Sequence, residues 1–233
     1  MAAGGVPRRQ AVVTPEYWND AKKHLAKTDP VLRKLIRSCR DADIATRRDA
    51  FQTLARAIVG QQISTKAAQS IWNRFAECAG TVSPAIVATL EHESLRACGL
   101  SNAKARYVRD LASHFATGSL KPRSWARMDD EAIIEDLTRV KGIGRWSAEM
   151  FLMFHLLRPD LLPVDDLGIR RAMERHFNAG RAIKKEKMRK IGERWAPYRS
   201  VASWYLWRSL ETPSGRLRGQ TPRINRSRGL SPK

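Results

Sequence analysis

LTRVKGIGRWSA, at residues 137–148, joins two segments whose apolar residues recur at helical spacing. The joint is short and holds Gly142 and Gly144, so it predicts two helices connected by a turn with glycine at both tight positions. Glycine lets the backbone approach an anion closely, and the N–H groups at the start of the following helix, aided by its dipole, hold that anion. Lys141 and Arg145 add positive charge beside it. An ordinary turn between helices would look similar, so the rest of the chain has to decide.

The charge balance favours a polyanionic partner. The 233 residues include 43 Lys and Arg against 23 Asp and Glu, which gives a formal net charge of +20. This is more than solubility requires, and it points first to nucleic acid. An acidic membrane surface is the alternative polyanion, but no apolar run approaches the roughly 18 residues that span a bilayer, and no lipidation motif is present. We therefore expect no membrane partner.

The start of the chain and the spacing of its cysteines and histidines bear on where the protein is located and on whether it binds a metal. Residues 1–10 include two arginines with no apolar stretch behind them, so we expect no secretory signal and an intracellular, DNA-associated protein of a bacterial cytoplasm or nucleoid, or of a nucleus. Three cysteines and five histidines are dispersed at wide spacing. Neither a disulfide framework nor a zinc site can be built from that spacing, and we expect no metal and no cofactor.

The pattern along the chain predicts an all-α fold. Helix starts are indicated by a capping residue before proline at Thr14-Pro15, Asp29-Pro30 and Ser83-Pro84, and by the capping residues Asp49, Ser101 and Asp129. We expect a flexible segment at 1–13, a module at 14–211 in which a lobe of about 50–160 is inserted between helices of 14–49 and 161–211, and a tail at 212–233. The tail has six basic residues and no acidic one, which is typical of a disordered segment.

Three further stretches extend the match beyond the hairpin: LPVDDLGIR at 162–170, IVGQQIS at 58–64, and RWAPYRS at 194–200 with Trp207 after it. Together with the hairpin, they resemble the helix-hairpin-helix DNA glycosylase superfamily over about residues 15–211. The resemblance is strongest to the alkylbase branch, the DNA-3-methyladenine glycosylase II type, in a compact form without an amino-terminal β-domain. It implies two helical lobes with an active-site cleft between them, and a monomer acting on double-stranded DNA that contains damaged bases.

The same resemblance implies a catalytic carboxylate at Asp165, which follows proline and one further residue. Cleavage of a glycosidic bond builds positive charge on the deoxyribose, so a fixed carboxylate can stabilise the transition state and orient or deprotonate the attacking water. Asp166 is the alternative catalytic residue. One of the two carboxylates is also expected to cap the helix that follows, and Asp166 is well placed for that role.

A lysine two positions after the second hairpin glycine serves as the nucleophile in the bifunctional members, and here that position is Trp146. The resemblance therefore implies a monofunctional enzyme without lyase chemistry. It also implies a substrate pocket of Trp146, Met150, Asp166 and Trp207, in which indole rings attract the positively charged bases 3-methyladenine and 7-methylguanine. Two other tryptophans, Trp72 and Trp195, are expected in the core.

The resemblance also places Gln62 where the family inserts a side chain into the gap left by a flipped nucleotide. The cations Lys104, Arg106 and Arg109 stay unassigned, because a charge run on a helix is usually a solvated face. Two alternatives remain open: a noncatalytic DNA-binding module, and a glycosylase for oxidised or mismatched bases. The full set of DNA-binding candidates is Gln62, Lys141, Gly142, Ile143, Gly144, Arg145 and Ser147.

Overall fold

The computed structural model describes residues 11–39, 44–46 and 49–210. The expectations for residues 1–10 and for the tail at 212–233 lie outside this part of the chain. Contacts divide the described chain into two compact units. The first unit holds the described residues up to 46 and those from Pro159 to Leu210, and the second unit holds residues 49–158.

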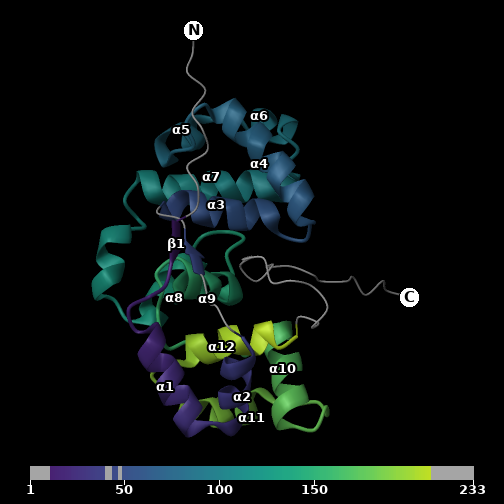
Figure 1. Cartoon of the computed structure of the whole chain (residues 1–233). Coiled ribbons are helices and arrows are strands. Elements are labelled where there is room, and N and C mark those ends of the chain that lie inside the picture. The colour runs from purple at the N-terminus through teal and green to yellow at the C-terminus, as the bar shows by residue number, and fades with distance from the viewer. Residues whose placement is uncertain (1–10, 40–43, 47–48, 211–233) are drawn as a thin grey trace. The chain divides into compact units, whose positions relative to one another are not determined.

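The first unit is helical, with one small ribbon of two strands (Figure 1). Strand β1 pairs antiparallel with β2, with Val12 opposite Ala45. Among its described residues, the helical segments of this unit pack mainly through α1 with α2 and α10 with α12. The elements of the unit are β1 (Ala11–Val13), α1 (Trp18–Thr28), α2 (Pro30–Ser38), β2 (Ile44–Thr46), α10 (Leu167–Phe177), α11 (Lys185–Gly192), the 3₁₀ turn η2 (Glu193–Trp195) and α12 (Arg199–Arg208).

The second unit is built of helices alone among its described residues. Helix α7 lies along α3 and α5, and α8 packs on α9 (Figure 1). The elements of the unit are α3 (Ala50–Gly60), α4 (Thr65–Ala79), α5 (Pro84–Thr89), α6 (His92–Ala97), α7 (Asn102–Ala116), the 3₁₀ helix η1 (Pro122–Arg127), α8 (Asp130–Thr138) and α9 (Arg145–Phe154).

Most helix starts lie where the sequence predicts them, because they are fixed by local hydrogen bonds. Asp29 accepts from the N–H groups of Val31 and Leu32, and Asp49, Ser101 and Asp129 each accept from the N–H three residues on. These contacts satisfy donors that have no partner inside the helix. The predicted all-α class is confirmed, with the β1–β2 ribbon as a local addition.

Residues 11–13 form β1, because their N–H and C=O groups find partners in β2 more than thirty positions along the chain. The flexible segment expected at 1–13 stays a prediction. One local expectation near the chain start is wrong. Helix α1 begins at Trp18 instead of directly after Thr14. The carbonyl of Pro15 accepts the N–H of Trp18 at 2.9 Å, so the proline forms a single turn ahead of the helix.

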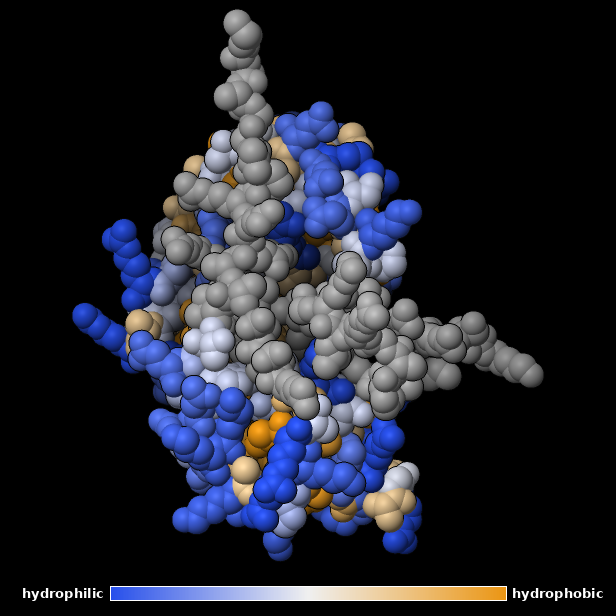
Figure 2. Space-filling model, viewed as in Figure 1, coloured by the Kyte–Doolittle hydropathy of each residue, from blue (hydrophilic) through white to orange (hydrophobic). Residues whose placement is uncertain are grey.

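Each unit has its own apolar core. Trp195 in the first unit is fully buried, and Trp72 in the second is 4% exposed, so both are core residues as predicted. Large apolar side chains are exposed at Ile86 and Leu167 among the described residues. Most of the residues coloured by hydropathy in Figure 2 are hydrophilic. No helix in the described part of the chain is both long and apolar enough to cross a membrane.

Candidate functional site

The predicted hairpin is formed by α8, a turn at residues 139–144 and α9. Gly142 has a φ of +84°, a region that favours glycine, and a Cβ built there would lie 2.2 Å from the ring of Tyr107. Both the backbone angle and the ring on α7 therefore exclude any larger residue at this position. The tight turn predicted at Gly142 is present.

Gly144 differs from this prediction. Its backbone is extended, with φ −93° and ψ 172°, and a Cβ there would meet no atom within 4 Å among the described residues. The turn itself thus does not require glycine at position 144. Gly144 is the N-cap of α9 and provides no side chain to cap it, so the helix N-terminus is left accessible to an anion from outside.

The N–H groups of the turn fall into two sets. Those of Lys141 and Ile143 are used internally, by the Asp110 carboxylate at 2.8 Å and by the Val140 carbonyl at 3.1 Å. Those of Gly142 and Gly144 have no acceptor within the described chain. The two glycine N–H groups are therefore the donors that the turn can offer to a phosphate.

The two cations of the hairpin that were predicted to bind DNA, Lys141 and Arg145, are both paired with carboxylates. Arg145 donates to both oxygens of Glu131, at 2.6 and 2.7 Å, and lies 3.3 Å from Glu149. Its hydrogen bond to Glu131 raises the pKa of Arg145 further, and the same contact lowers the pKa of Glu131. Lys141 is more open: its side chain is 74% exposed, and its Nζ lies 3.7 Å from Asp110.

The segment that carries Gln62 is held by two side chains of the same unit. Lys104 donates from Nζ to the carbonyls of Val59 and Gln61, at 2.9 and 2.6 Å. Gln61 in turn donates to the carbonyl of Gly142 at 2.7 Å, which ties the segment to the hairpin turn. Gln62 itself is exposed, as predicted for this joint. Its φ is +57°.

Asp165 and Asp166 have different surroundings. The carboxylate of Asp165 is exposed and forms an ion pair with Lys185, the first residue of α11. Asp166 is half-buried and is the N-cap of α10, where its Oδ1 accepts the N–H of Ile169 at 2.8 Å. The same oxygen accepts Nε1–H of Trp207 on α12 at 2.7 Å. Trp207 on α12 thus helps to fix the carboxylate of Asp166, while Lys185 offsets the charge of Asp165.

Gly168, in the first turn of α10, permits this arrangement. A Cβ there would lie 2.8 Å from Cδ1 and 3.0 Å from Nε1 of Trp207, and 3.0 Å from Oδ1 of Asp166. Only the absence of a side chain lets the indole lie against the start of the helix and donate to the carboxylate. The sequence shows Gly168 within its motif but does not reveal this contact, because the indole comes from 39 positions further along the chain.

The predicted pocket residues divide between the units. Asp166 and Trp207 are brought together in the first, while Trp146 and Met150 lie on α9 of the second, where Trp146 is half-buried and Met150 is 6% exposed. Sequence reasoning did not single out Gly168, which lies against Trp207 and Asp166, or Lys185, which pairs with Asp165. It left Lys104 unassigned, although this side chain holds the segment that carries Gln62. In the described ranges, no three His, Cys, Asp or Glu side chains gather in a way that could hold a metal ion.

Comparison with known proteins identifies the family. Residues 55–197 match the model of the HhH-GPD superfamily base excision DNA repair protein. The chain is 33% identical over 196 residues to DNA-3-methyladenine glycosylase 1 of Schizosaccharomyces pombe, covering 81% of this chain and 86% of that one.

Two solved structures share the fold. One is a 3-methyladenine DNA glycosylase of Schizosaccharomyces pombe in complex with abasic DNA, with a TM-score of 0.72 and 32% identity over 83% of this chain and 98% of that chain. The other is a DNA-3-methyladenine glycosidase from Bacillus halodurans, with a TM-score of 0.77 and 33% identity over 88% and 93%. The hairpin, the aspartate segment and these matches agree, and the chain belongs to the HhH-GPD superfamily of base excision DNA repair proteins.

Proposed function

We propose that this protein is a monofunctional DNA glycosylase that flips alkylated purines out of duplex DNA and hydrolyses their N-glycosidic bond. The substrates are bases of the 3-methyladenine and 7-methylguanine type, which the names of its relatives indicate. Positive charge on such bases suits a pocket with indole walls. Trp146, where bifunctional relatives have a nucleophilic lysine, favours hydrolysis without lyase chemistry.

The observation that carries the proposal is the fixed carboxylate of Asp166. A carboxylate stabilises the developing positive charge of the sugar only if it is held in place before the reaction. Asp166 is held by Ile169 and Trp207, whereas the charge of Asp165 is offset by Lys185. We therefore assign the catalytic role to Asp166 and leave Asp165, the residue favoured by the motif, as the alternative.

In this mechanism the hairpin binds the DNA backbone through the N–H groups of Gly142 and Gly144. Because no side chain of the described part demands glycine at 144, a closely approaching phosphate accounts for its presence there. Gln62, exposed on a segment fixed by Lys104, fills the gap left by the flipped base. The carboxylate of Asp166 then stabilises the oxocarbenium-like sugar while water attacks its anomeric carbon.

The first experiment is to incubate the protein with alkylated duplex DNA and to identify the released bases by chromatography. We expect free 3-methyladenine or 7-methylguanine and an unbroken abasic strand that alkali cleaves. Covalent protein–DNA adducts trapped by borohydride would contradict the monofunctional assignment, because they require an amine nucleophile. No base release at all would contradict the enzymatic proposal.

The second experiment compares Asp166→Asn with its neighbour Asp165→Asn in single-turnover excision of one defined lesion. Asparagine caps helices about as well as aspartate and can still accept from Trp207, so the first variant loses charge and keeps its shape. We expect it to be slower by about 10²- to 10³-fold, and we expect Asp165→Asn to stay within a few-fold of the parent. The reverse result would return the role to Asp165, and two active variants would refute the carboxylate mechanism.

A further inference from the structure

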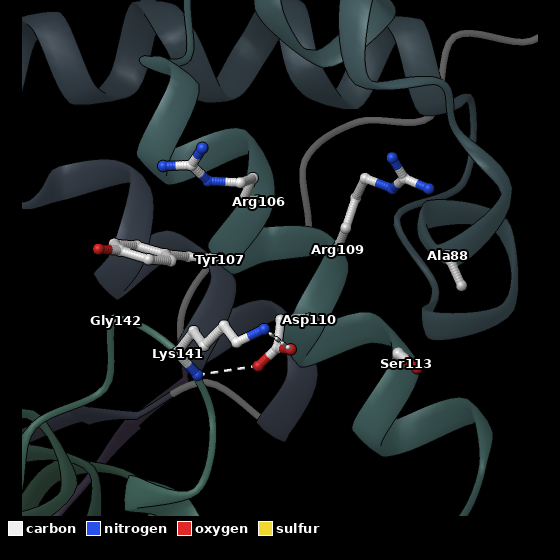
Figure 3. A pocket seen from close by; sticks show the side chains of 8 residues that line it. All are labelled: Ala88, Arg106, Tyr107, Arg109, Asp110, Ser113, Lys141 and Gly142. Atoms are coloured by element: carbon white, nitrogen blue, oxygen red, sulfur yellow. Dashed lines mark hydrogen bonds and ion pairs between the residues drawn. The ribbon is translucent and has the colours of Figure 1, made fainter.

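A groove of about 840 Å³ opens on the second unit beside the hairpin turn (Figure 3). One wall is α7, from which Arg106, Arg109 and Ser113 line it, and the hairpin contributes Lys141 and Gly142. In Figure 3 the guanidinium groups of Arg106 and Arg109 extend away from Asp110, and that of Arg109 lies toward Ala88 of α5. The groove therefore continues from the hairpin along the surface of α7.

The groove has an excess of positive charge. Its lining includes three cations, Arg106, Arg109 and Lys141, and one carboxylate, Asp110, so that its formal charge is 3 − 1 = +2. Lys141 and His114 each lie 3.7 Å from Asp110, which leaves that carboxylate engaged on both sides. Neither Arg106 nor Arg109 has a carboxylate within ion-pair distance in the described part of the chain.

Other cations around the hairpin are arranged differently. Arg139 pairs with Asp136, and Arg145 pairs with Glu131, so their charges are satisfied within the protein. The two arginines of α7 are three positions apart and thus project from one face of the helix. Unpaired guanidinium groups that share a groove with an anion-binding turn are suited to phosphate, because their planar N–H pairs match its oxygens.

We propose that this groove, defined by Arg106, Arg109 and Lys141, binds the backbone of the same DNA strand that the hairpin grips, beyond the phosphate held by Gly142 and Gly144. The inference rests on the proposed function and extends it to a second contact region. The groove is broad, basic and continuous with the hairpin turn, and these features suit the polyanionic backbone of a DNA duplex. These contacts bind phosphates and read no base, so they contribute affinity independent of sequence and lesion.

The test is the salt dependence of binding to an abasic-site duplex, measured for the parent, the double variant Arg106→Gln/Arg109→Gln, and a matched control, Arg123→Gln/Arg127→Gln. The control removes the same charge from two exposed arginines of η1 that do not line the groove. Each lost phosphate contact lowers the slope of log K against log salt by about 0.9, so the double variant should lose up to about 1.8. Arg106→Lys/Arg109→Lys should keep most of the slope.

Single-turnover excision by the Arg123→Gln/Arg127→Gln control should match that of the parent, whereas the groove variant should need a higher protein concentration to reach half of its full rate, because its affinity for the duplex is lower. Circular dichroism should confirm that the helices persist, as glutamine is a good helix former. A slope equal to that of the parent, or an equal loss in the control variant, would overturn the groove assignment. Failure of the proposed function is distinguishable, because it would appear as absence of base release by the parent itself.

Discussion

Gly168→Ala adds one methyl group at the point where α10, Trp207 and Asp166 meet. The new Cβ would lie 2.8 Å from the indole Cδ1 and 3.0 Å from Nε1, closer than van der Waals contact permits. The indole must move by several tenths of an ångström, and its 2.7 Å hydrogen bond to Asp166 must lengthen or break. Excision should fall because the carboxylate loses a donor that positions it.

The expected magnitude follows from that hydrogen bond. A hydrogen bond to a charged group contributes about 1.5–3 kcal/mol, and about 1.4 kcal/mol corresponds to a factor of ten in rate. Single-turnover excision should therefore slow by roughly 10- to 100-fold. In a helix, alanine is more favourable than glycine by about 1 kcal/mol, which partly offsets the lost hydrogen bond. The free energy of unfolding should therefore fall by less than the contribution of that hydrogen bond.

A double-mutant cycle with Trp207→Phe separates the indole from other causes. Phenylalanine keeps an aromatic ring but lacks the Nε1–H donor, so the two changes remove the same contact. Because both act on one hydrogen bond, the double variant should excise 7-methylguanine at about the rate of the slower single variant. Strictly additive losses, or a Gly168→Ala protein that excises at the parental rate, would refute the positioning role of Gly168.

Three further predictions concern other buried or half-buried groups. Lys104→Met removes the hydrogen bonds to the carbonyls of Val59 and Gln61 and should weaken base flipping. The measurement is the fluorescence rise of 2-aminopurine placed beside a lesion, which should be smaller in the variant. An unchanged rise would show that Gln62 is positioned without Lys104. Asp29→Ala should cost about 2–4 kcal/mol in urea unfolding, because the indole N–H of Trp195 and the N–H groups that begin α2 lose their buried acceptor. A loss under about 1 kcal/mol would contradict this. Burial, together with the nearby cations Arg175 and Lys34, lowers the pKa of His176. Below pH 6.5 the unfolded chain therefore binds more protons than the folded one, so the free energy of unfolding should fall as the pH drops through 6.5. His176→Gln should remove this part of the pH dependence in thermal unfolding.

The sequence predicted the helices well where their ends depend on neighbouring residues. Asp29, Asp49 and Ser101 cap helices through N–H groups two or three positions away, so a local pattern is sufficient to find them. The β1–β2 ribbon was missed because each strand has three residues and its partner lies far along the chain. The tight-turn conformation expected at Gly144 was wrong for a related reason. The sequence does not distinguish a glycine that the turn requires from one that leaves room for a ligand.

The sequence alone does not decide which of the two adjacent aspartates is catalytic. Counting from Pro163 favours Asp165, whereas the start of α10 selects Asp166 as its cap, and both patterns are present in the same five residues. What separates the two carboxylates comes from distant positions: Lys185, 20 residues after Asp165, and Trp207, 41 residues after Asp166. A cation beside a carboxylate offsets the charge that a sugar cation needs, while the indole donor of Trp207 and the N–H of Ile169 hold the carboxylate of Asp166 in place. On that ground we expect the second aspartate to be the catalytic one, although the motif alone favours the first.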